Sequence, residues 1–366
     1  MDSLLRALFS LGLFFFLLLC GCQLDYYAHL AGGQARIIWH CRSLTKVRQD
    51  TTQLPGDHRA FAVIDAVRQF GQRQIGLQPS DNYTCFFDTG DGPVSWNISA
   101  SPPHQFAAYR WSFPIVGSLP YKGFFNEERA RQEGQALQAQ GYDVLVRPVS
   151  AYSTLGYFTD PVLSTMLNYT DEGLADLVLH ELTHATVFAP EHTDYNESLA
   201  NFVGRQGSLD FLAHYHGPDS PLIEQARQKR RDAGRFGAFM TELVGQLDSL
   251  YNCPLDSSQI VAQRRHLFAT AKERFKELRG KFERSSYDGF LQWEINNARL
   301  LSYRRYNRST DVFAQVFEAH QGHWPPALAQ FQSCARQASP WDCLKQTAAT
   351  LRQQSEPAAT RGVKHH

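Results

Sequence analysis

Apolar residues recur at helical spacing along most of this 366-residue chain, and a shorter part alternates as strands do. Before residue 150 the pattern predicts helices at 25–47, 58–75 and 126–140, and short strands at 83–87, 94–98, 111–116 and 142–147. After residue 196 it predicts helices at 196–216, 222–250, 258–284, 292–307 and 312–319, with two shorter ones beside Pro340. The expected fold class is therefore α+β and predominantly helical, with a small sheet ahead of the long helical part.

A further helix, beginning at Asp171, carries the most informative residues of the chain. It contains the run His180-Glu181-Leu182-Thr183-His184, an H-E-x-x-H motif, and Pro190 is expected to end it. Positions i and i+4 share a helix face, so both histidine rings can reach one metal ion. Glu181 lies beside them as a general base, the arrangement of a zinc metallopeptidase. The alternative is a core helix with two hydrogen-bonded histidines.

A catalytic zinc ion takes three protein ligands, so a third one must be found. The three-histidine extension of the motif needs glycine at 187 and histidine at 190, and the chain has Val187 and Pro190, which excludes it. Glu197, in the first turn of a second helix that follows a short polar loop, is the preferred third ligand. His192 and Glu191 are rivals.

The residues around Glu197 bear on helix packing and on an alternative role for this glutamate. Ala200, Asn201 and Gly204 lie on the same side as Glu197 and are short, so the two helices can approach closely. Asp194-x-x-Glu197 also fits a capping box, in which case the glutamate would serve only the start of the helix.

The N-terminal sequence indicates that the body of the protein lies outside the cytoplasm. An apolar run over 11–19 precedes Leu19-Cys20-Gly21-Cys22, which resembles a bacterial lipoprotein signal with Cys22 as the first mature, lipidated residue. The run is short for a membrane-spanning helix, although an uncleaved anchor is the alternative. Gln23 favours the outer membrane, facing the periplasm.

Five segments follow from these patterns. They are a signal peptide at 1–21, an N-terminal helical segment at 22–80, a zincin-like core with the small sheet and the metal-binding helices at 81–220, a helical C-terminal region at 221–354, and a disordered tail at 355–366.

The composition excludes one class of partner, and the cysteines indicate one disulfide bond. Basic and acidic residues balance at 36 each, so the chain has no basic field for nucleic acid. Cys334 and Cys343 are the best disulfide candidates, because Ser339-Pro340 between them can reverse the chain. The remaining cysteines of the mature chain, Cys41, Cys85 and Cys253, cannot be paired from the sequence, and their odd number leaves at least one unpaired within the chain.

Several segments together carry a family resemblance. Asn196-Glu197-Ser198-Leu199-Ala200, following the H-E-x-x-H run, resembles the N-E-x-x-A element of gluzincins. With 116–125, 152–163 and 296–300 plus Tyr306, the chain resembles the bacterial predicted aminopeptidase family of zinc-dependent lipoproteins. The resemblance implies a gluzincin-type peptidase.

The expected function is hydrolysis of peptide bonds by a zinc-activated water, with Glu181 as general base and an aminopeptidase specificity. Tyr306 or Tyr303 would stabilise the oxyanion, and the family pattern prefers Tyr306. Asp176 and Asn196 are expected to orient the histidines. The partners would be a peptide substrate and a membrane, reached through the lipid anchor. The alternatives are an inactive zincin-fold lipoprotein acting as a scaffold or binding protein, and a structural lipoprotein without metal.

Overall fold

A computed structural model describes residues 24–49, 59–90, 92–113, 117–149, 159–306 and 310–355. It is predominantly helical, with 67% helix and a few small sheets, which confirms the predicted α+β character at this level. The predicted signal peptide, Cys22 and the tail beyond Ser355 lie outside the described residues. In the part that is described, no helix combines the length and the apolar character needed to cross a membrane.

Among the described residues, two three-stranded sheets and one two-stranded sheet lie in the first half of the chain. The larger one pairs β3 (Ser95–Ser101) antiparallel with β6 (Lys122–Phe124) and with β7 (Asp143–Val149). In the second, β2 (Cys85–Phe87) pairs antiparallel with β1 (Arg42–Ser43) and parallel with β8 (Val162–Leu163). The third joins β4 (Trp111–Phe113) to β5 (Gly117–Leu119). The strands that the sequence pattern missed are two or three residues long, too short to show alternation.

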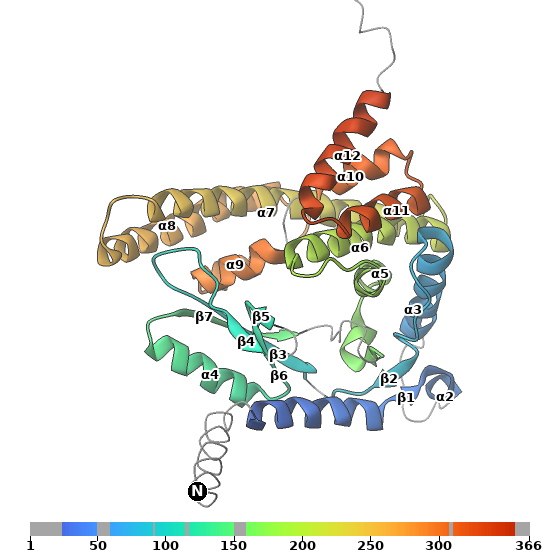
Figure 1. The fold of residues 1–366 in the computed structure, drawn as a ribbon, viewed down its shortest axis with the longest axis horizontal. Helices are drawn as coiled ribbons and strands as arrows, with labels where there is room; N and C mark the ends of the chain where they lie inside the picture. The colour runs from blue at the N-terminus through green and yellow to red at the C-terminus, as the bar shows by residue number, and fades with distance from the viewer. Residues whose placement is uncertain are drawn as a thin grey trace, which may run out of the picture.

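Helix α4 (Glu127–Ala139) lies along the β3–β7 sheet (Figure 1). Asn126 begins it, since its side chain accepts a hydrogen bond from the Arg129 backbone N–H at 2.9 Å. Ala130 and Leu137 then pack against Ile98 and neighbouring residues of the sheet, in a small core separate from the main one.

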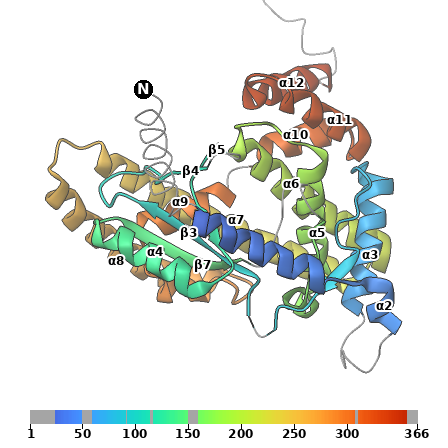
Figure 2. The same cartoon turned by 60° about the horizontal axis from the view of Figure 1, so that its bottom comes forward.

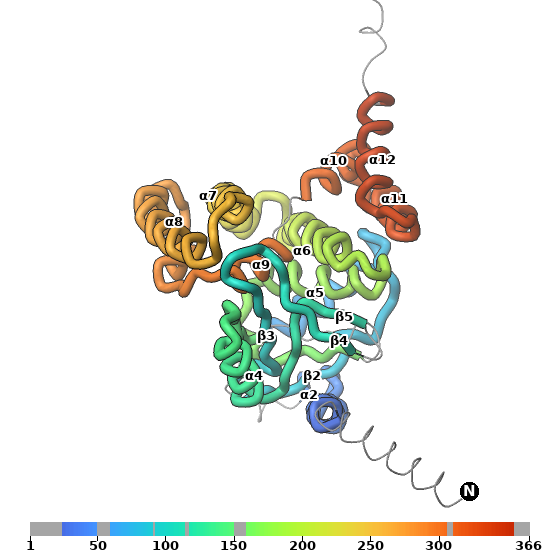
Figure 3. The backbone as a smooth tube through the Cα atoms, turned by 60° about the vertical axis from the view of Figure 1, so that its left-hand side comes forward, coloured from blue at the N-terminus to red at the C-terminus, as the bar shows by residue number. Residues whose placement is uncertain are grey.

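The main core is helical, and it holds the candidate site. Its helices include α3 (Arg59–Phe70), α5 (Asp171–Thr186), α6 (Thr193–His216), α10 (Asp311–Ala319), α11 (Trp324–Ala335) and α12 (Pro340–Ser355), with a π-helical turn at Gly71–Ile75. A second apolar cluster joins α7 (Pro221–Tyr251), α8 (Ser257–Leu278) and α9 (Asn297–Tyr306). Figure 3 shows α7 and α8 projecting on one side and α10–α12 on the other, with α5 and α6 between them.

Three predicted helices differ from the structure. The helix expected over 292–307 begins only at Asn297, as α9, where the Asn296 side chain accepts a hydrogen bond from the Arg299 backbone N–H at 2.9 Å. The helix expected over 25–47 is interrupted: one helix spans 24–40, the chain then forms β1, and α2 (Leu44–Gln49) follows. Cys41 forms a disulfide with Cys85 and β1 pairs with β2, contacts that a local pattern cannot reveal. Helix α8 ends at Leu278, before Gly280, whereas the pattern extended it to 284.

The disulfide predicted between Cys334 and Cys343 is confirmed. It links the end of α11 to the start of α12. Cys253 is a free, exposed cysteine.

Candidate active site

Helix α5 presents the H-E-x-x-H residues on a rigid element. Thr170 starts it by accepting a hydrogen bond from the Gly173 backbone N–H at 3.1 Å, and Asp171 and Glu172 complement the positive end of the helix dipole. Leu174, Leu182 and other apolar residues hold one face in the main core. The helix ends at Thr186, three residues before the predicted position, because Val187 already has an extended backbone.

The loop after α5 is held by the side chain of Asn196. Its Oδ1 accepts a hydrogen bond from the Ala189 backbone N–H at 2.8 Å, and its Nδ2 donates to the Ala189 carbonyl at 2.9 Å. Both bonds are buried. Asn196 thus fixes the connection between the two helices. The sequence predicted that it would orient a histidine ring, but these bonds reach the loop instead.

Helix α6 begins at Thr193 after His192, which makes no side-chain capping bond. Asp194 therefore lies inside the helix, and the capping-box alternative for Glu197 does not hold. Instead, Glu197 lies in the second turn and faces α5. The helices approach closely because glycine is present at Gly204, where a Cβ atom would lie 2.6 Å from the Asp176 carbonyl oxygen and 3.3 Å from His180 Cβ. The predicted close approach is confirmed.

His180, His184 and Glu197 bring three potential ligand atoms together. The two Nε2 atoms are 3.2 Å apart. Glu197 Oε2 lies 3.7 Å from His180 Nε2, and Glu197 Oε1 lies 3.9 Å from His184 Nε2. Among the described residues, this is the group of histidine, cysteine and acidic side chains whose geometry could hold a metal ion. The rival ligands His192 and Glu191 do not belong to it.

The three side chains fit a zinc ion. Tetrahedral zinc with ligands at about 2.0–2.2 Å separates its ligand atoms by roughly 3.3–3.6 Å, within a few tenths of an ångström of the 3.2, 3.7 and 3.9 Å seen here. Oε2 of Glu197 is buried, and no described residue donates a hydrogen bond to it. A buried carboxylate oxygen of this kind needs a cation or a donor. Two imidazoles and one carboxylate also form the ligand set of a known class of catalytic zinc sites.

Burial shifts the pKa values of all three candidate ligands. It lowers the pKa of His180 to about 3, helped by the charges of His184 and Arg205 and opposed by a hydrogen bond with the Asn201 side chain. Burial alone lowers the pKa of His184 to about 4. Both rings are therefore neutral at pH 7, which is the form that binds metal. Burial raises the pKa of Glu197 to about 7, against the lowering effect of nearby Arg305 and Arg147.

A cavity of about 450 Å³ opens beside His180, one of the three candidate ligands. His180, Glu181, Asp176 and Asn201 line it, together with residues from the start of α5 and Lys229 of α7. Glu181 therefore shares a cavity with a candidate ligand, as a general base requires. Asp176 lies one turn before His180. Burial and then Glu172 raise the pKa of Asp176 to about 6, while Arg205, Lys229 and Arg230 lower it.

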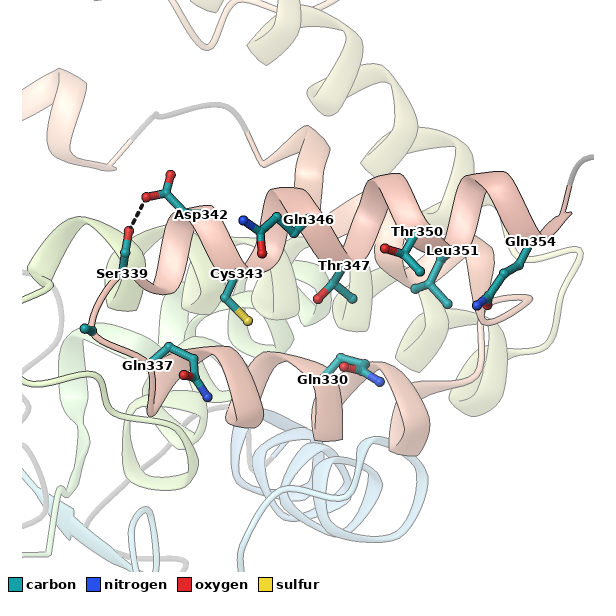
Figure 4. A pocket seen from close by; sticks show the side chains of 11 residues that line it. Gln330, Gln337, Ser339, Asp342, Cys343, Gln346, Thr347, Thr350, Leu351 and Gln354 are labelled. Atoms are coloured by element: carbon teal, nitrogen blue, oxygen red, sulfur yellow. Dashed lines mark hydrogen bonds between the residues drawn. The ribbon is translucent and has the colours of Figure 1, made fainter.

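A larger cavity, of about 740 Å³, lies between α11 and α12 (Figure 4). Its walls carry amides and hydroxyls, such as Gln330, Gln346 and Thr350. The carboxylate in its lining, Asp342, accepts a hydrogen bond from the Ser339 hydroxyl at 2.6 Å. Of the site residues predicted from the sequence, His180, Glu181 and Asp176 line the smaller cavity.

The two candidate oxyanion donors are placed differently. Tyr303 packs in the second apolar cluster, with its ring centroid 5.6 Å from that of Phe236, and burial raises its pKa. This environment is that of a packing tyrosine. Tyr306 ends α9, but its side chain lies outside the described residues.

Sequence reasoning missed four residues around the site. Asn201 bonds to His180, and Arg305 and Arg147 act electrostatically on Glu197. Arg305 is only 8% exposed. The sequence feature that could have indicated it was its neighbour Tyr306, already a candidate site residue. Tyr83 is a fully buried phenol whose pKa is raised by burial first and then by the charges of Glu181 and Asp160. No described residue forms a hydrogen bond with its hydroxyl.

Comparison with known proteins identifies the family. Neither a curated protein nor a solved structure matches this chain. A family model described as "Putative aminopeptidase" matches residues 25–340, which include every helix of the candidate site. That range is well over half of the chain, and the predicted family membership is confirmed: the protein belongs to this aminopeptidase family.

Proposed function

We propose that this protein is a zinc-dependent peptidase of the gluzincin type, with a zincin-like catalytic core and aminopeptidase specificity. The observation that carries the proposal is the convergence of His180, His184 and Glu197 within 4.8 Å of one another. Family membership supports a peptidase and a peptide substrate. These residues would hold the zinc ion through the two Nε2 atoms and the Glu197 carboxylate.

When bound, zinc supplies Lewis acidity that polarises a peptide carbonyl and makes water more acidic. Side chains of the protein would transfer the proton and orient the metal ligands. Glu181 takes the proton of the attacking water and passes it to the leaving amine. Asn201 orients the His180 ring through its hydrogen bond. The guanidinium groups of Arg305 and Arg147 favour the charged form of Glu197, against the effect of burial, which raises its pKa to about 7.

The proposed location is the outer membrane, facing the periplasm, with lipid attached at Cys22. Two disulfides in the described part of the chain are compatible with an oxidising compartment.

Glu181→Gln separates the general base from the metal site. The variant should keep stoichiometric zinc and lose about 100-fold or more of the hydrolysis rate, the usual contribution of a positioned base. Peptides with free and with acetylated N-termini test exopeptidase specificity in the same assay. Retained activity in the variant would overturn the proposed role of Glu181. If the wild type bound zinc but cleaved no peptide of a library, the scaffold alternative would replace the enzyme.

A further inference from the structure

The helix over 24–40 has an apolar side that nothing in the described structure covers. Its inner side is built into the protein: Tyr26 and Ile37 are buried, and Gln34 is 9% exposed. The outer side would ordinarily be polar. Instead, Leu24 is 55% exposed, Ile38 50% and Trp39 81%. Ala28 and Ala31 lie between them and are also exposed.

These residues form one stripe. Leu24, Ala28, Ala31, Ala35 and Ile38 follow one another at alternating steps of four and three residues, and Trp39 borders the last of them. This spacing places them on a single helix face. The stripe lies opposite Tyr26 and Ile37, so the helix is apolar on both sides, a pattern typical of helices that are covered on both.

The helix is firmly attached to the body of the protein. The Tyr26 hydroxyl donates a hydrogen bond to the Gly123 carbonyl at 3.0 Å, and the Phe125 backbone N–H donates to His29 Nε2 at 3.0 Å. Asp25 forms an ion pair with Arg129 at 2.9 Å. Figure 1 shows the helix along the bottom edge of the molecule, far from α10–α12, and Figure 2 shows it across the face that the turn brings forward. Whatever covers the stripe therefore sets the orientation of the whole protein.

We propose that this stripe rests on the surface of an anionic lipid bilayer. Only Gln23 separates the helix from Cys22, the lipid attachment site under the proposed location. Two residues of extended chain span about 7 Å, so a lipid on Cys22 would hold the start of the helix at the membrane. Tryptophan, as at Trp39, favours the membrane–water interface.

Charge supports the same partner. Residues 24–49 contain four basic residues (Arg36, Arg42, Lys46 and Arg48) and one acidic residue, Asp25, although the whole chain is balanced. Arg36 and Lys46 are exposed, whereas Arg48 forms an ion pair with Asp65 at 2.7 Å. Asp25 is neutralised by Arg129. Exposed basic groups beside an apolar helix face favour anionic lipid headgroups. A lipid anchor combined with such a face gives a firmer attachment than one acyl chain alone.

The test uses a chain that begins at Gln23 and so carries no lipid, while every described residue is kept. Binding is measured by co-sedimentation with phosphatidylglycerol–phosphatidylethanolamine vesicles and with phosphatidylcholine vesicles. We expect binding to the anionic vesicles, weakened about tenfold or more by Ile38→Ser with Trp39→Ser. Tyr215→Ser is the matched control, since Tyr215 is also exposed, at 45%, but lies at the end of α6.

Three results would overturn the proposal. The first is equal vesicle binding by the wild type and the double variant. The second is no vesicle binding together with a dimer, seen by sedimentation velocity, that the double variant dissociates; a second copy would then cover the stripe. The third is no binding and a monomer that the double variant destabilises, which would place the stripe against the chain itself. Peptide hydrolysis by the double variant should equal that of the wild type, so failure of this proposal is distinct from failure of the proposed enzyme.

Discussion

Replacement of Gly204 by alanine tests the close contact between the two ligand-bearing helices. A Cβ atom at this position would lie 2.6 Å from the Asp176 carbonyl oxygen and would also collide with the Asp176 carboxylate. The carbonyl belongs to the backbone of α5, so it cannot move aside as a flexible side chain could. Helix α6 must therefore shift away from α5, and it carries Glu197 with it.

The expected magnitude combines two opposing effects. Overpacking of a well-packed contact costs about 1–3 kcal/mol. Exchange of glycine for alanine within a helix contributes about 1 kcal/mol in the other direction. Gly204→Ala should thus lower the free energy of unfolding by up to about 2 kcal/mol. Gly245 in α7 is the control, because it is exposed and a Cβ atom there would meet nothing within 4 Å. Gly245→Ala should stabilise the protein by about 1 kcal/mol.

Urea unfolding of the metal-free variants measures this difference, and zinc titration against a competing chelator measures the effect on the site. We expect Gly204→Ala to weaken zinc binding about tenfold or more, because Glu197 is displaced from the two histidines. Gly245→Ala should leave zinc affinity unchanged. If both variants were stabilised equally and bound zinc equally, the close packing of α5 on α6 would not be what places the third ligand.

Three further predictions concern groups around the site. The folded state raises the pKa of Asp176 to about 6, so the stability that this group contributes at low pH is lost as the pH rises through 6. Between pH 4 and pH 8, the free energy of unfolding of Asp176→Asn should therefore rise by up to about 3 kcal/mol relative to that of the wild type, as measured by urea unfolding without metal. A difference between variant and wild type that does not change with pH would contradict the raised pKa. Tyr83→Phe removes a buried hydroxyl without a described hydrogen-bond partner, so the free energy of unfolding should stay constant or rise by about 1 kcal/mol, whereas a clear loss would reveal a hidden bond. Cys41→Ser with Cys85→Ser opens a loop with a sequence separation of 44 residues and should cost about 4 kcal/mol in urea unfolding, while an unchanged midpoint would exclude the bond.

The ligand group was accessible from the sequence because local rules govern it. Helical spacing places His180 and His184 on one face, and the break between α5 and α6, which Pro190 indicated, brings Glu197 back to them. The short side chains of α6 indicated the close approach that Gly204 makes possible.

Contacts between distant segments were not accessible in this way. Arg305 reaches Glu197 from a helix more than one hundred residues later, and Tyr83 approaches Glu181 from the strand region. The first helix was predicted too long for the same reason, since the disulfide to Cys85 and the pairing of β1 are long-range constraints. The partners of Asn196 also depended on the path of the loop at Ala189.

Anomalous diffraction at the zinc edge, from crystals of the protein purified with zinc, is the decisive test of the proposed zinc site. We expect one peak bounded by His180 Nε2, His184 Nε2 and the Glu197 carboxylate, with each ligand atom at about 2.0–2.2 Å. The absence of a peak at this position, or a peak coordinated without any one of these three side chains, would contradict the proposed site.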